Sequence, residues 1–232
     1  MALSQFEEVV VYDTGSTDQT REIAQTFPNV KLFEGSFEGF GPTHNKASSL
    51  CSNDWILSID ADEVLSDSFK ENIFKMKLDP QKVYAIPRYN YYKETHIKWC
   101  GWHPEKHLRL YNRKHTQFSS SLVHETIEHK HMEVSTFPYP IYHYTYGSLS
   151  EFLVKMERYS TLFAEQNAGK KRSSPLIALK HSMWTFVKSY FIRWGFLGGY
   201  EGLLISSYMA HTAFYKYLKL YEKNLELQKG ES

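Results

Sequence analysis

Three carboxylates, Asp60, Asp62 and Glu63, follow a short apolar run at Trp55–Ile59. An apolar run of this length, bounded by polar residues, predicts a buried strand, so the acids stand at its end. Carboxylates this close repel one another unless a cation or hydrogen bonds offset their charge. Mg²⁺ and Mn²⁺ take oxygen ligands and share them with substrate phosphates. A helix with an acidic first turn and a Ser66 cap is the alternative, and these residues alone leave both interpretations open.

A second acid follows the β-branched run Phe6–Tyr12, where Asp13 leads into a turn. Gly15 permits a sharp reversal, and Ser16 can cap the helix that comes next. We therefore expect a strand, a tight turn and a helix. Asp13 is a candidate ligand-binding residue, although taken without Asp60 it is better explained as a turn residue that bonds to its own backbone.

A glycine-bearing segment, 38–47, lies between these two acidic strand ends and leads into a predicted helix. Gly39 and Gly41 let the backbone approach a ligand closely, and Asn45 and Lys46 could reach phosphate oxygens. By itself such a segment is usually only a connection. Its position between the two strand ends makes it a candidate for phosphate binding.

Strands and helices alternate along the first half of the chain, since the segment after Asp13 reads as a helix to about Phe27 and 30–33 reads as a strand. Such alternation predicts an α/β domain with a parallel sheet, in which ligands bind at the carboxyl ends of the strands. Asp13 and Asp60 both occupy such ends. We therefore expect them to belong to one site.

Composition excludes several classes of protein. The 232 residues suffice for one α/β domain with an appendage, and a formal charge of +1 argues against general nucleic-acid binding. Two cysteines do not make a disulfide framework. Residues 1–8 lack the features of a signal peptide, and charged residues interrupt every long apolar run. We expect a cytoplasmic protein.

The C-terminal part predicts helices. Ser148 to Glu151 resembles a capping box, which favours a domain boundary with a catalytic part at 1–147 and a helical part at 148–232. Apolar residues rich in Trp share one side of a helix predicted at 180–194. Aromatic residues with nearby cations are typical of a helix that lies on an anionic membrane, while packing on the catalytic domain or on a partner subunit is the alternative.

The motifs together resemble family-2 glycosyltransferases, and within that family the bacterial lipopolysaccharide core-type glucosyltransferases. Order and spacing both match. The likeness rests on residues 9–20, on Gly39-Phe40-Gly41 with Asn45, on 55–63, and on Gly101-Trp102-His103-Pro104, Arg109-Leu110-Tyr111, Val123-His124-Glu125 and His143-Tyr144-Thr145-Tyr146.

The resemblance implies a GT-A fold, a nucleotide-diphosphate sugar such as a UDP-hexose as donor, and a divalent metal, Mg²⁺ or Mn²⁺. Asp62 would be the direct metal ligand, and Asp60 would lie near the ribose and the metal. His143 could complete the metal or diphosphate site, or be a hydrogen-bonded structural histidine. The remaining candidates for donor binding are Asp13, Ser16, Asn45 and Lys46.

Inverting transfer needs a base that takes the proton of the acceptor hydroxyl. We expect Glu125 in this role, with Glu63 or Glu105 as substitutes if Glu125 faces away. Aromatic and cationic residues gather over 83–113, which suits a phosphorylated, lipid-linked or lipopolysaccharide-type glycan acceptor. Trp102 and Arg109 are the predicted acceptor contacts, and a strand pair with core aromatics is the alternative.

One departure from the family is expected at the N-terminus, because the β-α unit that normally precedes the Asp13 strand is missing. A non-catalytic nucleotide-sugar-binding remnant at the membrane is therefore one alternative function. A phosphatase of the haloacid dehalogenase type is another, since 60–64 also fits its D-x-D-x-[TV] strand end with Asp60 as nucleophile. The function that the sequence favours is an inverting, metal-dependent glycosyltransferase, peripheral at the inner face of the membrane.

Overall fold

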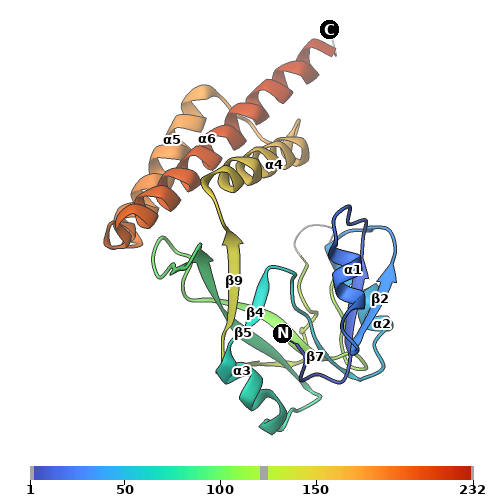
Figure 1. The fold of residues 1–232 in the computed structure, drawn as a ribbon. Coiled ribbons are helices and arrows are strands. Elements are labelled where there is room, and N and C mark those ends of the chain that lie inside the picture. The colour runs from blue at the N-terminus through green and yellow to red at the C-terminus, as the bar shows by residue number, and fades with distance from the viewer. Residues whose placement is uncertain (1–2, 121–124, 231–232) are drawn as a thin grey trace. The chain divides into compact units, whose positions relative to one another are not determined.

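The computed structural model describes residues 3–120 and 125–230 (Figure 1). The chain divides into two compact units, and the division does not follow a single cut in the sequence. The first unit contains residues 1–88 and 105–142, and the second contains residues 89–104 and 143–232. The long strand β5 and the strand β9 each run from one unit into the other. The boundary expected at 147/148 stays a prediction.

The first unit begins with the predicted alternation of strands and helices. The sharp reversal after β1 falls at Gly15, whose φ of 114° is in the region that favours glycine. Helix α2 starts directly after Gly39 (φ 105°), but α1 starts after Gln19, so the expected cap of this helix by Ser16 is wrong. These elements are β1 (Val9–Asp13), α1 (Thr20–Gln25), β2 (Val30–Glu34) and α2 (Phe40–Ser49).

The rest of the first unit is mainly strands. It contains β3 (Trp55–Leu57), β4 (Glu63–Leu65), α3 (Asp67–Asn72), the 3₁₀ helix η1 (Ile73–Lys75), most of β5 (Lys82–Tyr92), β7 (Glu105–Asn112), β8 (Glu133–Thr136) and the start of β9 (Ile141–Tyr146).

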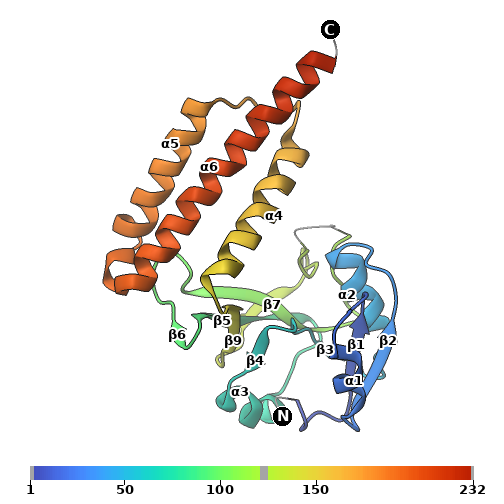
Figure 2. The same ribbon diagram turned by 45° about the horizontal axis from the view of Figure 1, so that its top comes forward.

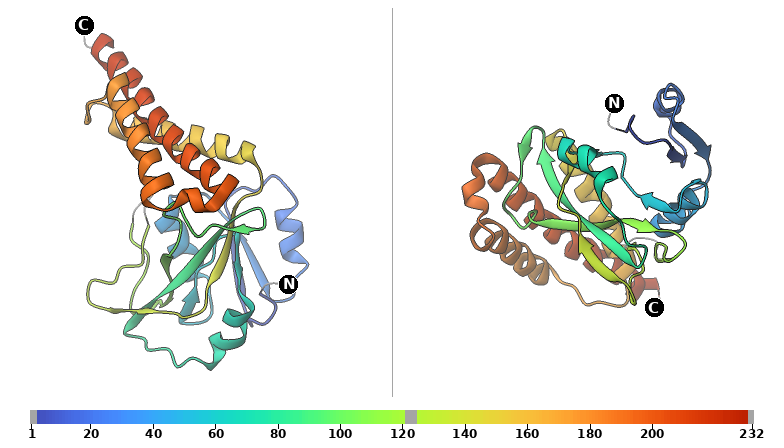
Figure 3. Two further views of the ribbon diagram at one scale, coloured as in Figure 1. Left: turned by 90° about the vertical axis from the view of Figure 1, so that its left-hand side faces the viewer. Right: turned by 90° about the horizontal axis from the view of Figure 1, so that it is seen from below.

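The sheet is mixed, in contrast to the parallel sheet that the alternation predicts. β1 and β2 pair in parallel as a separate two-stranded sheet, seen in blue in Figure 3 apart from the green strands. The larger sheet has the order β3-β7-β5-β9-β4, and β6 and β8 also pair with β5. β7 is antiparallel to both β3 and β5. The prediction fails because β3 is followed by a turn and a short strand rather than by a crossover helix.

The structure tests the helical interpretation of the acidic stretch and confirms only the Ser66 cap. Ser66 does cap a helix, α3, since its hydroxyl accepts a hydrogen bond from the Phe69 backbone nitrogen at 3.1 Å. That helix begins at Asp67, after the acids, and Glu63 is the first residue of β4. Asp60 and Asp62 therefore lie in the turn between two strands and not in a helical first turn.

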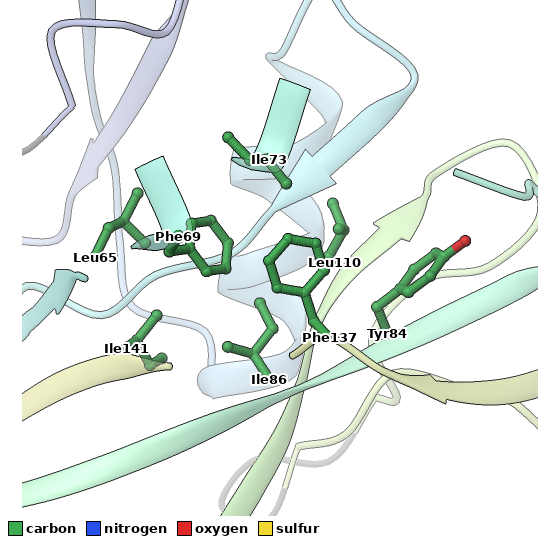
Figure 4. Close-up of a cluster of buried hydrophobic side chains, with 8 residues drawn as sticks. All are labelled: Leu65, Phe69, Ile73, Tyr84, Ile86, Leu110, Phe137 and Ile141. Atoms are coloured by element: carbon green, nitrogen blue, oxygen red, sulfur yellow. The ribbon is translucent and has the colours of Figure 1, made fainter. Parts of the chain in front are cut away.

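One hydrophobic cluster of the first unit lies where α3 and η1 pack on the sheet (Figure 4). Phe69 of α3 and Phe137 are both fully buried, with ring centroids 4.6 Å apart. Side chains from four strands complete the cluster, which fixes β4 and hence the end of the acidic turn. Its buried members are Leu65, Phe69, Ile73, Tyr84, Ile86, Leu110, Phe137 and Ile141.

The second unit is a strand hairpin with helices. Its hairpin joins the end of β5 to β6 (Thr95–His96), and its helices are α4 (Leu149–Asn167), α5 (Pro175–Val187), the π-helix η2 (Lys188–Ile192), the 3₁₀ helix η3 (Gly195–Gly198) and α6 (Gly199–Gly230). Figure 2 shows α5, α6 and α4 side by side.

The predicted capping box is confirmed, since Ser148 Oγ accepts from the Glu151 nitrogen at 3.4 Å and Glu151 Oε2 accepts from the Gly147 nitrogen at 2.9 Å. Within the described residues, no helix combines the length and the apolar character needed to cross a bilayer.

Two phenylalanines test the importance of the buried cluster. Phe69→Ala should lower the free energy of unfolding by about 3–5 kcal/mol, because it leaves a cavity where a fully buried ring was. Phe74→Ala is the matched control, since Phe74 is 64% exposed, and should cost less than about 1 kcal/mol. Urea unfolding of both variants measures the two values, and equal losses would contradict this description of the core.

Candidate functional site

Arg109 of β7 fixes the acidic turn through ion pairs with two of its carboxylates. Antiparallel pairing brings β7 beside β3, and the Ser58 nitrogen donates to the Arg109 carbonyl at 2.8 Å. The Arg109 Nη2 atom contacts Glu63 Oε1 at 2.7 Å, and Nη1 contacts Asp60 Oδ1 at 3.3 Å. A further ion pair joins Nη2 to Asp60 Oδ2. One guanidinium group thus binds the first and the last acid of the turn.

Burial makes these ion pairs strong determinants of the local structure. Arg109 is buried and the Glu63 side chain has 0% exposure, so removal of either group would leave a buried charge with a weaker set of partners. Burial opposes the charged form of Arg109, but the carboxylates of Glu63 and Asp60 raise its pKa above the ordinary value. The Asp60 nitrogen also donates to Glu63 Oε2 at 3.0 Å, which closes the turn.

A second arginine extends the network away from the turn. Arg88 Nη1 lies 3.4 Å from Glu63 Oε1, and Arg88 Nη2 lies 3.1 Å from Glu105 Oε1. Glu63 and Glu105, the two substitutes for the predicted base, are therefore both engaged in ion pairs with arginine. The Glu63 side chain is fully buried as well, whereas that of Glu105 is 35% exposed. Glu125 stays the predicted base.

His44 belongs to the same neighbourhood and is absent from the predicted site. Its Nδ1 lies 3.2 Å from Ser58 Oγ, and its ring stacks on Phe118 at 4.5 Å between centroids. Burial lowers the pKa of His44, although the charge of Asp60 acts in the opposite direction, as do those of Glu125 and Glu63. The sequence signal that could have found it is its place in α2, directly before Asn45.

Asn45 positions the aromatic partner of His44. Its side-chain nitrogen donates to the Phe118 carbonyl at 2.9 Å, and its oxygen accepts from the Phe118 nitrogen at 2.9 Å. The amide is thus used to hold the segment around Phe118 against α2. Lys46 lies next to it with an exposed side chain. Donor contacts by Asn45 and Lys46 stay predictions.

Asp13 organises the turn after β1. Its carboxylate accepts from the Ser16 nitrogen at 3.1 Å and from the Ser16 hydroxyl, and Arg21 Nε lies 3.4 Å away. The Ser16 side chain is the main cause of the lowered pKa of Asp13, with the charge of Arg21 contributing. The interpretation of Asp13 as a turn residue describes this geometry, and the donor contacts of Asp13 and Ser16 stay predictions.

Two predicted site residues belong to the second unit. His143 is buried, and its Nδ1 lies 2.7 Å from Asn90 Oδ1, as expected for a hydrogen-bonded structural histidine. Trp102 is half-buried, stacks on Tyr146 with 5.9 Å between centroids, and accepts a hydrogen bond from Asn90 at its carbonyl. Their predicted contacts with a metal and with an acceptor are not tested by this arrangement.

Glu125 is half-buried in the first unit, close enough for its charge to act on His44. Val123 and His124, which belong to the same family-like motif, lie outside the described residues. The first unit contains a cavity of about 810 Å³. Its lining includes Ser119 and also Thr126, the residue that follows Glu125. Its lining is rich in basic and histidine side chains: Arg113, Lys114, His115, His129, Lys130 and His131.

The donor groups at the turn fit a cation shared with a substrate better than one enclosed by protein. No cluster of three or more His, Cys, Asp or Glu able to hold a metal occurs among residues 3–120 and 125–230. The turn offers Asp60, whose side chain is 38% exposed, and the exposed Asp62. Mg²⁺ is commonly bound by one or two carboxylates together with substrate phosphates, so this sparse set is compatible with it.

Sequence comparison identifies the family. The model of the family described as Glycosyl transferase family 2 matches residues 2–134. The chain belongs to glycosyl transferase family 2. The resemblance found in the motifs is confirmed, and the chain is a glycosyltransferase with an α/β domain of the GT-A type. This membership decides against the phosphatase alternative.

The relatives extend the match over most of the chain. A protein described as an uncharacterised glycosyltransferase of Rickettsia bellii (strain RML369-C) is 30% identical, over 95% of this chain and 79% of the relative. The lipopolysaccharide core biosynthesis glycosyltransferase LpsC of Rhizobium meliloti (strain 1021) is 23% identical, over 96% of this chain and 86% of LpsC. Among solved structures, S. aureus TarS 1–349 in complex with UDP-GlcNAc is 12% identical, with a TM-score of 0.41, over 96% of this chain and 83% of that one.

The pH dependence of folding tests the environment of His44. Because burial lowers the pKa of His44 in the folded protein, this histidine takes up its proton at a higher pH in the unfolded chain than in the folded one. Protonation of His44 therefore favours unfolding as the pH falls below the ordinary pKa of histidine. His44→Gln should therefore lose less stability than wild type between about pH 7.5 and 5.5. Urea unfolding across this range measures the difference. His131→Gln, at an exposed position, is the control, and identical pH profiles for His44→Gln and wild type would contradict the assignment.

Proposed function

We propose that this family-2 glycosyltransferase moves a sugar with inversion from a nucleotide diphosphate, a UDP-hexose in the first instance, to an anionic lipid-linked or lipopolysaccharide-type glycan. The observation that carries the proposal is the turn from Asp60 to Asp62, partly exposed and fixed by buried Arg109. A preorganised acidic turn can bind a charged donor without the free-energy cost of first ordering the turn.

The donor side of the proposal uses the first strand ends of the chain. Asp13, with Ser16, would contact the uracil or ribose, and Asp60 would lie near the ribose. Asn45 and Lys46 would approach the phosphates from α2. Arg109 has a positioning role here, because its terminal nitrogens are bonded to Asp60 and Glu63 and hold the turn in place.

A divalent cation, bound directly by Asp62 and near Asp60, would neutralise the charge that builds on the departing diphosphate. The network already contains three carboxylates, Asp60, Glu63 and Glu105, against two guanidinium groups, Arg88 and Arg109. These five groups carry a formal charge of −1. That excess, with Asp62 beside it, favours a cation at the exposed side of the turn.

In the reaction, an acceptor hydroxyl oxygen forms a bond to the anomeric carbon from the face opposite the diphosphate. The bond between that carbon and the diphosphate oxygen breaks, and the electron pair leaves with the nucleotide. Glu125 takes the proton of the attacking hydroxyl. A neutral His44 beside the turn adds no positive charge that would compete for the carboxylates.

The basic cavity in the first unit supports an anionic acceptor. The cavity is lined by Arg113, Lys114, Lys130 and three histidines. Its lining also includes Thr126, which directly follows Glu125 in the chain. Phosphorylated sugars are bound through charge-assisted hydrogen bonds of this kind. LpsC, a relative, is named for lipopolysaccharide core biosynthesis, which agrees with such an acceptor. A lipid-linked acceptor in turn favours a peripheral location at the inner face of the membrane.

Transfer from a panel of nucleotide sugars, measured by release of the nucleotide diphosphate with Mn²⁺ or Mg²⁺, tests the proposal. Asp62→Asn should lower turnover at least about 100-fold, and chelation by EDTA should do the same to wild type. Glu125→Gln should lower kcat about 100- to 10,000-fold with little change in KM for the donor.

Matched controls separate these roles from general damage. Glu71→Gln and Asp79→Asn change exposed acids that belong neither to the acidic turn nor to the lining of the basic cavity, and both should retain wild-type turnover. Turnover unchanged in Asp62→Asn would remove the metal assignment. Full activity in Glu125→Gln would place the base elsewhere.

A further inference from the structure

Helix α5 exposes its apolar side and buries its small and polar side. Leu176, Leu179, Met183 and Val187 are all exposed, and their spacing of three or four residues places them on one side of the helix. Trp184, beside them, is 57% exposed. A contiguous exposed apolar stripe on a folded chain marks an interaction surface.

The opposite side of α5 packs on α6 through small and polar contacts. Ala178 is fully buried, and His181 stacks on Tyr217 with 4.0 Å between centroids. Just beyond α5, Ser189 is buried and its hydroxyl lies 2.9 Å from Ser206 Oγ. These contacts hold that side of the helix to α6, so the apolar stripe faces outward.

The apolar surface continues past α5 into η2 and η3. Phe191, Ile192, Trp194, Phe196 and Leu197 are exposed, with Trp194 at 60%. Trp194 adopts a φ of 57°, which is uncommon for a bulky residue and marks a constrained position. We call the surface formed by the exposed apolar residues from Leu176 to Leu197 the α5–η3 face.

The charge of this region has one sign. No Asp or Glu occurs between Glu165 and Glu201, while that interval contains six cations: Lys170, Lys171, Arg172, Lys180, Lys188 and Arg193. Lys180, Lys188 and Arg193 lie within α5, η2 and the turn after them, and all three are exposed. Aromatic and aliphatic side chains interspersed with cations alone are complementary to an anionic bilayer surface.

A cavity of about 610 Å³ opens in this face, between the hairpin and the η2–η3 turn of the second unit. Lys98, His103 and Arg193 supply its polar lining, and Ile192, Trp194 and Leu197 are among its apolar residues. His103 has a buried ring nitrogen, Nδ1, with no hydrogen-bond partner. Buried polar atoms are normally hydrogen-bonded, and a phosphate group bound in the cavity could be the hydrogen-bond partner of this nitrogen.

The walls of this cavity are fixed by close packing. The Arg193 side chain lies over Gly101, where an added Cβ would meet Nη1 at 2.1 Å. The Cys100 nitrogen donates to the Arg193 carbonyl at 3.0 Å, which ties the hairpin to the turn. Trp99 packs on Gly198, where an added Cβ would lie 3.0 Å from the ring. The cationic groups are therefore presented from a built site.

We propose that the α5–η3 face docks on an anionic phospholipid bilayer and that the cavity of Lys98, His103 and Arg193 receives a lipid phosphate headgroup. The proposal rests on the membrane location proposed above and names the surface and the lipid chemistry responsible. The apolar side chains enter the interfacial region, and the cations bind headgroups. A second copy of the chain is less well matched to this face, because two surfaces that carry the same cations repel each other.

Flotation of the full chain with vesicles tests the proposal. Vesicles of phosphatidylcholine with 30% phosphatidylglycerol should bind the protein far better than pure phosphatidylcholine, by about fivefold for each cation that engages a headgroup. Trp184→Ser and Trp194→Ser should each weaken binding. Arg193→Gln should lower the preference for anionic vesicles about fivefold.

Matched controls keep these results specific. Phe74→Ser removes an aromatic ring that is equally exposed in the first unit, and Lys77→Gln removes an exposed cation there, so both should bind vesicles like wild type. Near-ultraviolet circular dichroism checks that each variant is folded. Asp62→Asn should also bind like wild type, so a failed transfer assay with intact vesicle binding would affect the proposed reaction alone.

Three results would overturn the proposal. The first is wild-type binding to neither kind of vesicle, and the second is binding that Trp194→Ser and Arg193→Gln leave unchanged. The third is concentration-dependent dimerisation in sedimentation that Trp184→Ser abolishes, which would assign the face to a second copy. Under the first result, binding of inorganic phosphate would assign the cavity to a soluble anion.

Discussion

The buried guanidinium of Arg109 is the interaction on which the rest of the site depends. It binds Asp60 and Glu63, which stand at opposite ends of a turn that would otherwise place several like charges beside one another. Because the Glu63 side chain is fully buried, its charge needs cationic partners, and Arg109 at 2.7 Å is closer to it than Arg88 at 3.4 Å. The pairing of β7 with β3 brings Arg109 to the turn, so the sheet itself determines where the acids point.

This arrangement divides the carboxylates into two groups with different chemistry. Glu63 and Glu105 are committed to Arg88 and Arg109 and act as structural anions. Asp60 is shared between the network and the exposed side of the turn, and Asp62 is exposed. Asp60, Asp62 and Glu63 look alike in the sequence because they are close together, and burial sets Glu63 apart from the other two.

Local patterns predicted the strands, the Ser66 and Ser148 caps and the membership of family 2, because these depend on residues close together in the chain. The mixed sheet was not predictable in the same way, since β3 and β7 pair across more than fifty residues of intervening chain. The contacts of Arg109 with Asp60 and Glu63 were not predictable for the same reason, and its contact with an acceptor stays a prediction. His44 was missed because its neighbours, Ser58 and Phe118, are also distant in sequence.

The central claim, that Arg109 and Glu63 stabilise each other as a buried pair, is tested most directly by a double-mutant cycle. Urea unfolding at pH 7 of wild type, Arg109→Met, Glu63→Leu and the double variant gives the coupling free energy. Each single change should cost about 3–5 kcal/mol, because it leaves a buried charge without its partner. The double variant should cost less than the sum of the two by more than about 1.5 kcal/mol. Additive losses, within about 0.5 kcal/mol, would contradict the account.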